Sequence, residues 1–138
     1  MSTTTRRFHS AKLLLPAIII AGVLLLSTVI PADPADEKLL RHVVLFKFTD
    51  STTPEQIKQV EDAFRALPSK ISLIRGFEWG TNVSPENLNQ GYTHCFFLTF
   101  ASDKDRDAYL VHPAHKEFGK ILTPYLDKVT VVDFWAQK

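Results

Sequence analysis

The sequence predicts an α+β domain in which four strands of one antiparallel sheet alternate with helices. Four segments show the alternating or β-branched and aromatic patterns typical of strands, namely 41–48, 77–81, 92–100 and 129–135. Two further segments begin with helix-capping residues, one at Thr53 and one at Ser102. The order strand, helix, strand, strand, helix, strand is that of a ferredoxin-like βαββαβ protomer.

The first predicted strand is largely apolar on both faces. One face carries His42, Val44, Phe46 and Phe48, and the other carries Val43 and Leu45. A strand that is apolar on both sides is expected to be covered on both sides.

The first helix has a well-marked beginning. Thr53 is expected to cap it, Pro54 fits its first turn, and Gln56 completes a capping box. We expect the helix to end at Pro68, because proline lacks the N–H that the helical ladder needs. One face of the helix carries an apolar stripe of Ile57, Val60, Phe64 and Leu67.

The third strand and the helix that follows it place further polar groups among apolar ones. One face of the strand is predicted to carry Tyr92, His94, Phe96, Leu98 and Phe100. Ser102 caps the next helix, which carries Tyr109 and is expected to break at His112, because a residue before proline avoids the α region. Another helix then starts at Pro113 and ends near Pro124.

His115 is expected to point into the domain. It shares one helical face with Phe118 and Leu122, at positions i, i+3 and i+7. An enclosed imidazole is either a packed, hydrogen-bonded core residue or a working acid/base group.

The sheet has one face that its own helices cannot cover. That face would carry Val43, Leu45, Cys95 and Phe97, which are too apolar to meet water. A second copy packed sheet to sheet would bury them, so we expect a homodimer whose sheets form a dimeric α/β barrel.

The N-terminal segment is predicted to be a targeting element. Arg6, Arg7 and Lys12 precede an uncharged run from residue 13 to residue 32. This layout fits a cleaved secretory signal peptide or an uncleaved transmembrane helix, because the run is long enough to span a bilayer. The sequence thus divides into a leader at 1–32, a linker at 33–39 and a domain at 40–138. We expect export across the membrane, with membrane attachment if the leader is retained.

Charge and composition exclude other classes of function. From residue 33 onward the chain has 13 basic and 15 acidic residues and no basic stripe, which argues against nucleic-acid binding. Cys95 is the single cysteine and is expected to be a buried strand residue. No Cys/His spacing resembles a zinc site.

Five segments together resemble the stress-responsive dimeric α/β-barrel (Dabb) family. They are 41–48 (RHVVLFKF), 76–80 (GFEWG) with 82–84 (NVS), 91–94 (GYTH), 112–115 (HPAH) and 132–134 (VDF). The resemblance runs from about Leu40 to Phe134. It implies a ferredoxin-like protomer and a dimeric barrel, as expected from the two apolar faces.

The resemblance also implies a set of pocket residues. The family includes a plant polyketide cyclase that works by an intramolecular aldol condensation without a cofactor, using a histidine and a tyrosine. Its pattern is matched by His42, His94, Tyr109 and His115. By this resemblance His115 would be the general base and Tyr109 would orient the substrate or stabilise an oxyanion. We therefore expect a pocket for a small hydrophobic molecule, with no cofactor and no metal.

Other hypotheses remain open. The histidines can instead be structural, bonded to each other, to backbone carbonyls or to water, in a non-catalytic stress protein that acts through its dimer. Three histidines can also hold a transition metal, although no carboxylate partner stands at ligand spacing. Related dimeric barrels oxidise aromatic compounds or degrade haem, a hypothesis that rests on the fold alone.

Overall fold

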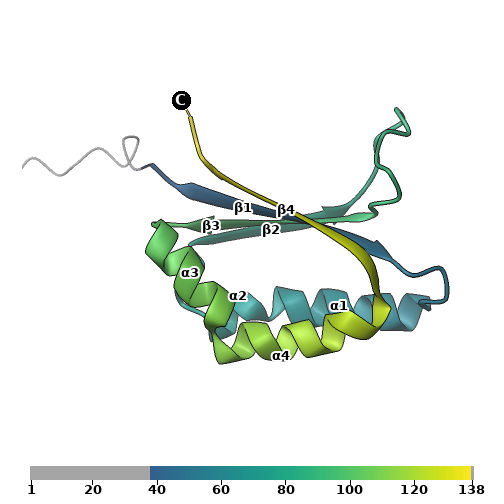
Figure 1. Cartoon of the computed structure of the whole chain (residues 1–138), viewed down its shortest axis with the longest axis horizontal. Helices are drawn as coiled ribbons and strands as arrows, with labels where there is room; N and C mark the ends of the chain where they lie inside the picture. Colours follow the sequence, from purple (N-terminus) through teal and green to yellow (C-terminus); the bar gives the residue numbers. More distant parts are fainter. Residues whose placement is uncertain (1–37, 138) are drawn as a thin grey trace, which may run out of the picture. The chain divides into compact units, whose positions relative to one another are not determined.

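The computed structural model describes residues 38–137, which contain one four-stranded antiparallel sheet in the order β2-β3-β1-β4. The ferredoxin-like βαββαβ order is confirmed, with all helices on one face of the sheet (Figure 1). The elements are β1 (Leu40–Phe48), α1 (Pro54–Arg65), α2 (Leu67–Lys70), β2 (Gly76–Thr81), β3 (His94–Phe100), α3 (Asp103–Val111), α4 (Pro113–Leu122), the 3-10 turn η2 (Thr123–Tyr125) and β4 (Leu126–Trp135).

Aromatic side chains fill the space between the sheet and the helices. Phe64 of α1 stacks on Phe96 of β3 at 4.1 Å between ring centroids and lies 4.6 Å from Phe118 of α4. Phe46 of β1 completes this group, 5.2 Å from Phe96. Burying such rings supplies much of the free energy of folding, so this group fixes α1 and α4 on the sheet.

The predicted start of the first helix is confirmed, but its predicted end is wrong. The Thr53 hydroxyl oxygen accepts from the backbone amide of Gln56, and the Gln56 side-chain oxygen accepts from the backbone amide of Thr53, which together form a capping box. The helix stops at Arg65, and Pro68 lies in the first turn of the separate short helix α2. Proline cannot donate within a helical ladder but fits a first turn, so it interrupts one helix and starts the next.

Tyr92 also differs from its prediction. β3 begins only at His94, and Gly91 before Tyr92 has a positive φ of 84°. This turn directs Tyr92 to the side of the sheet away from the helices, where its hydroxyl bonds to Thr130 Oγ1 at 2.6 Å. Tyr92 lies in the turn before the strand and not in the strand itself, so the alternation that places Phe96 beside His94 does not extend to Tyr92.

The break between α3 and α4 forms where it was predicted. His112 is extended (φ −62°, ψ 138°), ends α3 and caps α4, and its Nδ1 accepts from the Ala114 amide at 3.1 Å. Pro113 occupies the first turn of α4. This capping role satisfies a helix N–H that would otherwise lack a partner.

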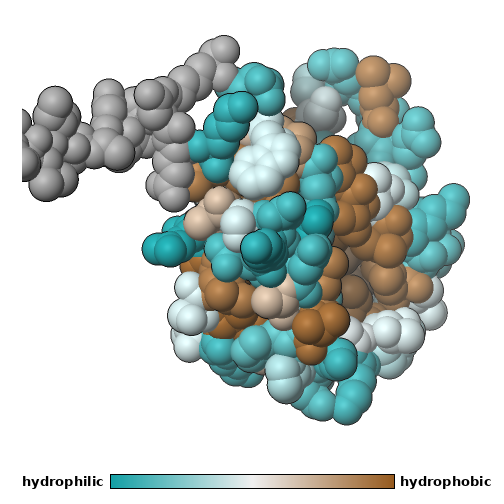
Figure 2. Space-filling model, turned by 60° about the vertical axis from the view of Figure 1, so that its left-hand side comes forward, coloured by the Kyte–Doolittle hydropathy of each residue, from teal (hydrophilic) through white to brown (hydrophobic). Residues whose placement is uncertain are grey.

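The face of the sheet away from the helices, here called the outer face, is apolar and uncovered within the described chain. It carries Val43, Leu45, Cys95, Phe97, Val132 and Phe134. Val132 and Phe134 are 51% and 44% exposed. Figure 2, turned about the vertical axis of Figure 1, sees this upward-facing side of the sheet edge-on, and the apolar residues that it shows gather mainly on the right-hand part of the domain.

The predicted leader at 1–32 and most of the linker at 33–39 lie outside the described residues. Within 38–137, no helix is both long enough and apolar enough to span a bilayer.

Candidate functional site

A cavity of about 290 Å³ lies between the sheet and helices α3 and α4. Most of its wall is apolar, and the polar groups in the wall come from two histidines, one tyrosine and one aspartate. Val129 and Val131 of β4 are 48% and 50% exposed, so the cavity opens beside this edge strand. The lining residues are His42, Val44, Phe46, Phe64, Tyr109, Leu110, His115, Phe118, Gly119, Leu122, Val129, Val131 and Asp133.

The structure brings together three of the four predicted site residues. His42 comes from β1, Tyr109 from the end of α3 and His115 from the start of α4. The Tyr109 ring lies 5.8 Å from the His42 ring and 4.4 Å from the His115 ring, measured between centroids. An apolar cavity with a few convergent polar groups is the usual form of a small-molecule site.

Tyr109 brings an unused hydrogen-bonding group to this cavity. Its side chain is fully buried, and its hydroxyl has no partner among the described residues. Burial raises the pKa of the Tyr109 phenol well above its ordinary value, because the phenolate is poorly solvated there. The phenol is therefore neutral over the physiological pH range and can donate to an oxygen in the cavity.

His115 is oriented as a base. Its Nδ1 lies 3.1 Å from the Leu110 carbonyl oxygen, which can only accept, so Nδ1 carries the proton. In the neutral ring this leaves Nε2 with a free lone pair. Burial lowers the pKa of His115, helped by nearby His42 and His112, while the bond to Leu110 opposes this. At neutral pH the ring is thus uncharged and able to accept a proton.

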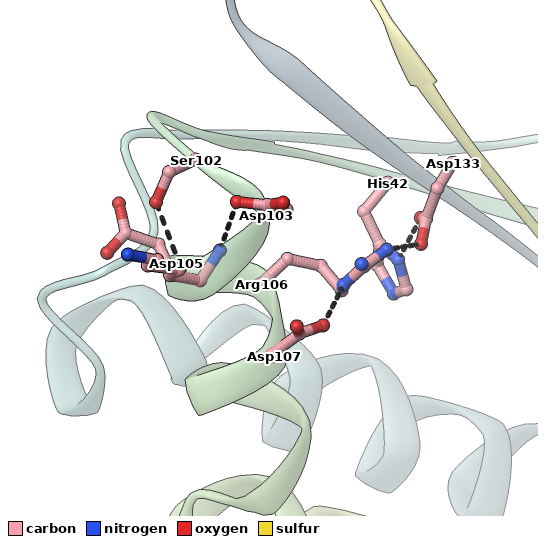
Figure 3. A network of polar contacts seen from close by, with 8 residues as sticks. His42, Ser102, Asp103, Asp105, Arg106, Asp107 and Asp133 are labelled. Atoms are coloured by element: carbon pink, nitrogen blue, oxygen red, sulfur yellow. Dashed lines mark hydrogen bonds and ion pairs between the residues drawn. The ribbon is translucent and has the colours of Figure 1, made fainter.

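His42 forms a pair with Asp133 that the sequence did not predict. The two residues lie opposite each other on β1 and β4, and His42 Nδ1 is 2.6 Å from Asp133 Oδ1 (Figure 3). The carboxylate accepts from Nδ1–H, so Nε2 of His42 is the acceptor nitrogen in the neutral ring. The only sign in the sequence was an acidic residue among the apolar residues of 131–135, on an alternating position that faces the helices.

His94 does not join this group, which corrects the prediction that it lines the same pocket. It pairs with Phe46 in the sheet register, whereas His42 pairs with Leu98. His94 Nε2 is 3.0 Å from Glu61 Oε1, its Nδ1 is 2.8 Å from Thr93 Oγ1, and its ring packs edge-on against Phe48. Buried and bonded at both nitrogens, His94 has the contacts of a structural residue.

Neither the cysteine nor a cluster of metal-ligating side chains provides a second chemical centre among residues 38–137. Cys95 is partly buried on the outer face, and burial raises the pKa of its thiol, which disfavours the nucleophilic thiolate. Within 38–137, no three His, Cys, Asp or Glu side chains gather closely enough to hold a metal ion.

Known proteins, of which two are described here, are similar to this chain in sequence. The stress-response A/B barrel domain-containing protein HS1 of Arabidopsis thaliana is 43% identical over 95 residues, which cover 69% of this chain and 87% of that protein. Olivetolic acid cyclase of Cannabis sativa is 29% identical over 99 residues, which cover 72% of this chain and 98% of the cyclase.

Solved structures show the same fold. The hydroxynitrile lyase of Passiflora edulis matches with a TM-score of 0.70 and 25% identity, over 74% of this chain and 96% of the lyase. A protein of unknown function from Thermobifida fusca, described as dimeric and ferredoxin-like, matches with a TM-score of 0.64 and 27% identity, over 73% of this chain and 93% of that one. The model of the stress responsive A/B barrel domain matches residues 40–136, and the chain belongs to this family.

Proposed function

We propose that this domain binds a small apolar molecule that carries a carbonyl or hydroxyl oxygen, and that it catalyses a cofactor-free acid/base step on it. The observation that carries the proposal is the buried Tyr109 hydroxyl, which has no partner among the described residues and stands beside the His115 ring. A buried polar group without a partner costs free energy, so such a group in a cavity wall favours a ligand that satisfies it.

The proposed step divides the work between two side chains. His115 Nε2 takes a proton from the carbon next to a carbonyl group. The electron pair of that C–H bond forms a C=C bond to the carbonyl carbon, and the π pair of the carbonyl group moves onto its oxygen, which gives an enolate. The neutral Tyr109 phenol then donates a hydrogen bond to the developing oxyanion. His42, oriented by Asp133, offers a second acceptor nitrogen to the same cavity.

The names of the relatives agree with this chemistry. One relative is a cyclase and one structural neighbour is a hydroxynitrile lyase. The polyketide-cyclase chemistry implied by the sequence resemblance is one form of the proposed proton transfer. The cavity volume of about 290 Å³ limits the bound part of the ligand to a small molecule.

Isotope exchange tests the reaction directly. Phenylacetone in D₂O is the probe, because its benzylic carbon is acidified by a neighbouring carbonyl, and mass spectrometry follows deuterium uptake there. We expect the wild-type chain to accelerate uptake and His115→Asn to reduce the acceleration by about 10²-fold or more, the usual contribution of a general base. The matched control is His112→Asn, which changes the neighbouring histidine and retains a side chain able to cap α4.

A second measurement separates catalysis from binding alone. If phenylacetone raises the melting temperature of the wild type and of His115→Asn equally while neither accelerates exchange, the cavity binds but does not catalyse. If the probe changes neither property, the proposal is wrong for this class of carbonyl compound.

We further propose that the chain forms a homodimer through its outer face. The apolar residues of this face are only half-buried in the described protomer, and similar structures are described as dimeric. A second copy that covers the outer face leaves the cavity free on the opposite side of the sheet. The alternative function, a stress protein that acts only through its dimer, keeps the dimer but predicts no ligand-dependent change in the melting temperature.

Export is also a proposal. The positively charged start and the uncharged run up to residue 32 support a leader that carries the domain across a membrane. The mass of the mature chain isolated from its cell distinguishes cleavage near residue 32 from retention of the anchor. Recovery of the full-length chain in the cytosol would overturn the proposal.

A further inference from the structure

The His42–Asp133 pair continues to a third residue on α3. Arg106 Nη1 donates to Asp133 Oδ2, while Arg106 Nε donates to Asp107 Oδ1 at 2.7 Å (Figure 3). The carboxylate of Asp133 is therefore held from two sides, by His42 at Oδ1 and by Arg106 at Oδ2. None of the sequence patterns had indicated a role for this arginine.

We propose that Arg106 is a positioning residue for His42. It fixes the rotation of the Asp133 carboxylate, so that Oδ1 always accepts from His42 Nδ1–H and the free lone pair of His42 stays on Nε2. This inference deepens the proposed function, on which it rests, because it concerns the second acceptor nitrogen of that site.

The geometry of an arginine suits this task. Its guanidinium is planar and presents several donors in fixed directions, so one Arg106 side chain can hold two carboxylates at once. Asp107, on the same helix, fixes the guanidinium from behind. A lysine would supply the positive charge but not the planar set of donors in fixed directions.

A purely stabilising role is the simpler explanation, and the magnitudes argue against it. The Arg106 and Asp133 side chains are 21% and 27% exposed, and solvent-accessible ion pairs contribute only about 0–1 kcal/mol to folding. His42, in contrast, is buried. The chain of contacts thus leads from the surface to an imidazole in the cavity wall, where the choice of tautomer has a chemical consequence.

The position of the helix supports the same inference. Arg106 lies one helical turn before Tyr109 on α3, and the Arg106 amide donates to the Ser102 carbonyl at the capped start of that helix. The helix that carries Tyr109 into the cavity therefore also carries the residue that orients Asp133. One rigid helix therefore fixes the positions of both Tyr109 and Arg106, so the tyrosine and the His42–Asp133 pair keep a constant arrangement in the site.

Imidazole NMR tests the proposal without any substrate. Long-range ¹H–¹⁵N spectra of the full-length ¹⁵N-labelled chain in detergent micelles, recorded near pH 8, report which ring nitrogen of each histidine carries the proton. We expect wild-type His42 to be a single tautomer with the proton on Nδ1. In Arg106→Met, which keeps the aliphatic stem, we expect the other tautomer to appear as a measurable fraction.

Two further variants control the result. Arg106→Lys retains the charge and should restore part of the wild-type tautomer preference. Arg65→Met removes an arginine that pairs with Asp62 and stacks over Trp79, away from this network, and should leave His42 unchanged. If Arg106→Met fails to fold, Arg106→Gln replaces it, because glutamine keeps an N–H donor and lacks the fork.

The outcomes separate the inference from the function on which it rests. A His42 tautomer that stays the same in a folded Arg106→Met overturns the role of Arg106, whatever the activity. A shifted tautomer, together with a roughly ten- to a hundredfold slower phenylacetone exchange, supports it. A shifted tautomer with no exchange in the wild type supports the positioning role and overturns the proposed reaction.

Discussion

His42 and Asp133 face each other across two paired strands, and the imidazole Nδ1 lies 2.6 Å from the carboxylate. This pairing gives a buried histidine a defined tautomer and a defined direction toward the cavity. It is the part of the candidate site that depends most directly on strand register, because a slip of one residue would turn Asp133 to the outer face.

Replacement of Asp133 by asparagine tests this pair. An asparagine amide can donate to Nδ1 instead of accepting from it, which would move the His42 proton to Nε2. We expect Asp133→Asn to slow phenylacetone exchange by about tenfold or more while the chain still folds. Unchanged exchange would mean that His42 takes no part in the reaction. Asp127→Asn is the control, because Asp127 pairs with Lys47 outside the cavity.

Two tyrosine-to-phenylalanine changes should have opposite effects on stability. Tyr109→Phe removes a buried hydroxyl without a partner among the described residues, so the free energy of unfolding should stay level or rise by up to about 1 kcal/mol. Tyr92→Phe removes a bond to Thr130 and should lower it by about 1 kcal/mol. Urea denaturation measures both, and Tyr109→Phe should also weaken the stabilisation by phenylacetone. A large loss of stability in Tyr109→Phe would show that the hydroxyl is already satisfied.

His94 is expected to matter for folding and not for chemistry. His94→Leu would leave Glu61 without its partner near the core, so we expect a loss of about 1–3 kcal/mol in the free energy of unfolding. Exchange of phenylacetone per folded molecule should stay at the wild-type rate. The comparison with His115→Asn is the decisive one, because that variant should show the reverse pattern. A His94 variant that folds well but loses exchange would return this residue to the site.

The lowered pKa of His115 predicts a specific pH dependence of stability. In the unfolded chain the histidine has its ordinary pKa of about 6.5, whereas burial lowers the pKa in the folded chain. Between these two values the unfolded state binds more protons, so folding weakens as the pH falls below about 6.5. The slope from one such group cannot exceed about 1.4 kcal/mol per pH unit.

Urea denaturation at pH 7.5 and pH 5.5 checks this dependence. We expect His115→Asn to lose less stability than the wild type between these two values, because asparagine does not titrate. Equal losses in the two proteins would show that His115 is protonated as easily in the folded chain as in the unfolded one.

A charge on the outer face should separate the proposed dimer. Phe97 lies opposite Val43 in the middle of that face, and a carboxylate there would lose its hydration against the second copy, with only the Arg41 guanidinium beside it. We expect Phe97→Glu to sediment as a monomer while the wild type sediments as a dimer. Val111→Glu, at an exposed position at the end of α3, is the control and should remain dimeric. A monomeric wild type would refute the dimer.

The sequence pattern predicted correctly which face of the sheet each histidine occupies, but it could not predict how far apart the two histidines lie along the strands. Alternation placed His42 and His94 on the same side of the sheet, and both do lie there. His94 pairs with Phe46, which lies four residues after His42 on β1. At about 3.3 Å per residue, the two histidines are therefore separated by roughly 13 Å along the strands. Register depends on tertiary packing, so the sequence pattern had no means of separating them.

The same limit hid Asp133 and Arg106. Asp133 is visible in the sequence as a polar residue within the apolar end of its strand, but its partner depends on β4 lying beside β1 in one register. Arg106 lies in a polar stretch of α3, where an arginine resembles any solvated charge. By contrast the helix break between Tyr109 and His115 could be predicted, because the adjacent residues His112 and Pro113 determine it. The place of Tyr109 in a site was implied by the family resemblance.

The break at His112 determines how Tyr109 and His115 meet. In one uninterrupted helix, residues six positions apart differ by about 9 Å in height and point about 120° away from each other. Here their rings lie 4.4 Å apart. The corner between α3 and α4 therefore brings the two rings together. A mutation that straightened it would separate Tyr109 from His115 without changing either side chain.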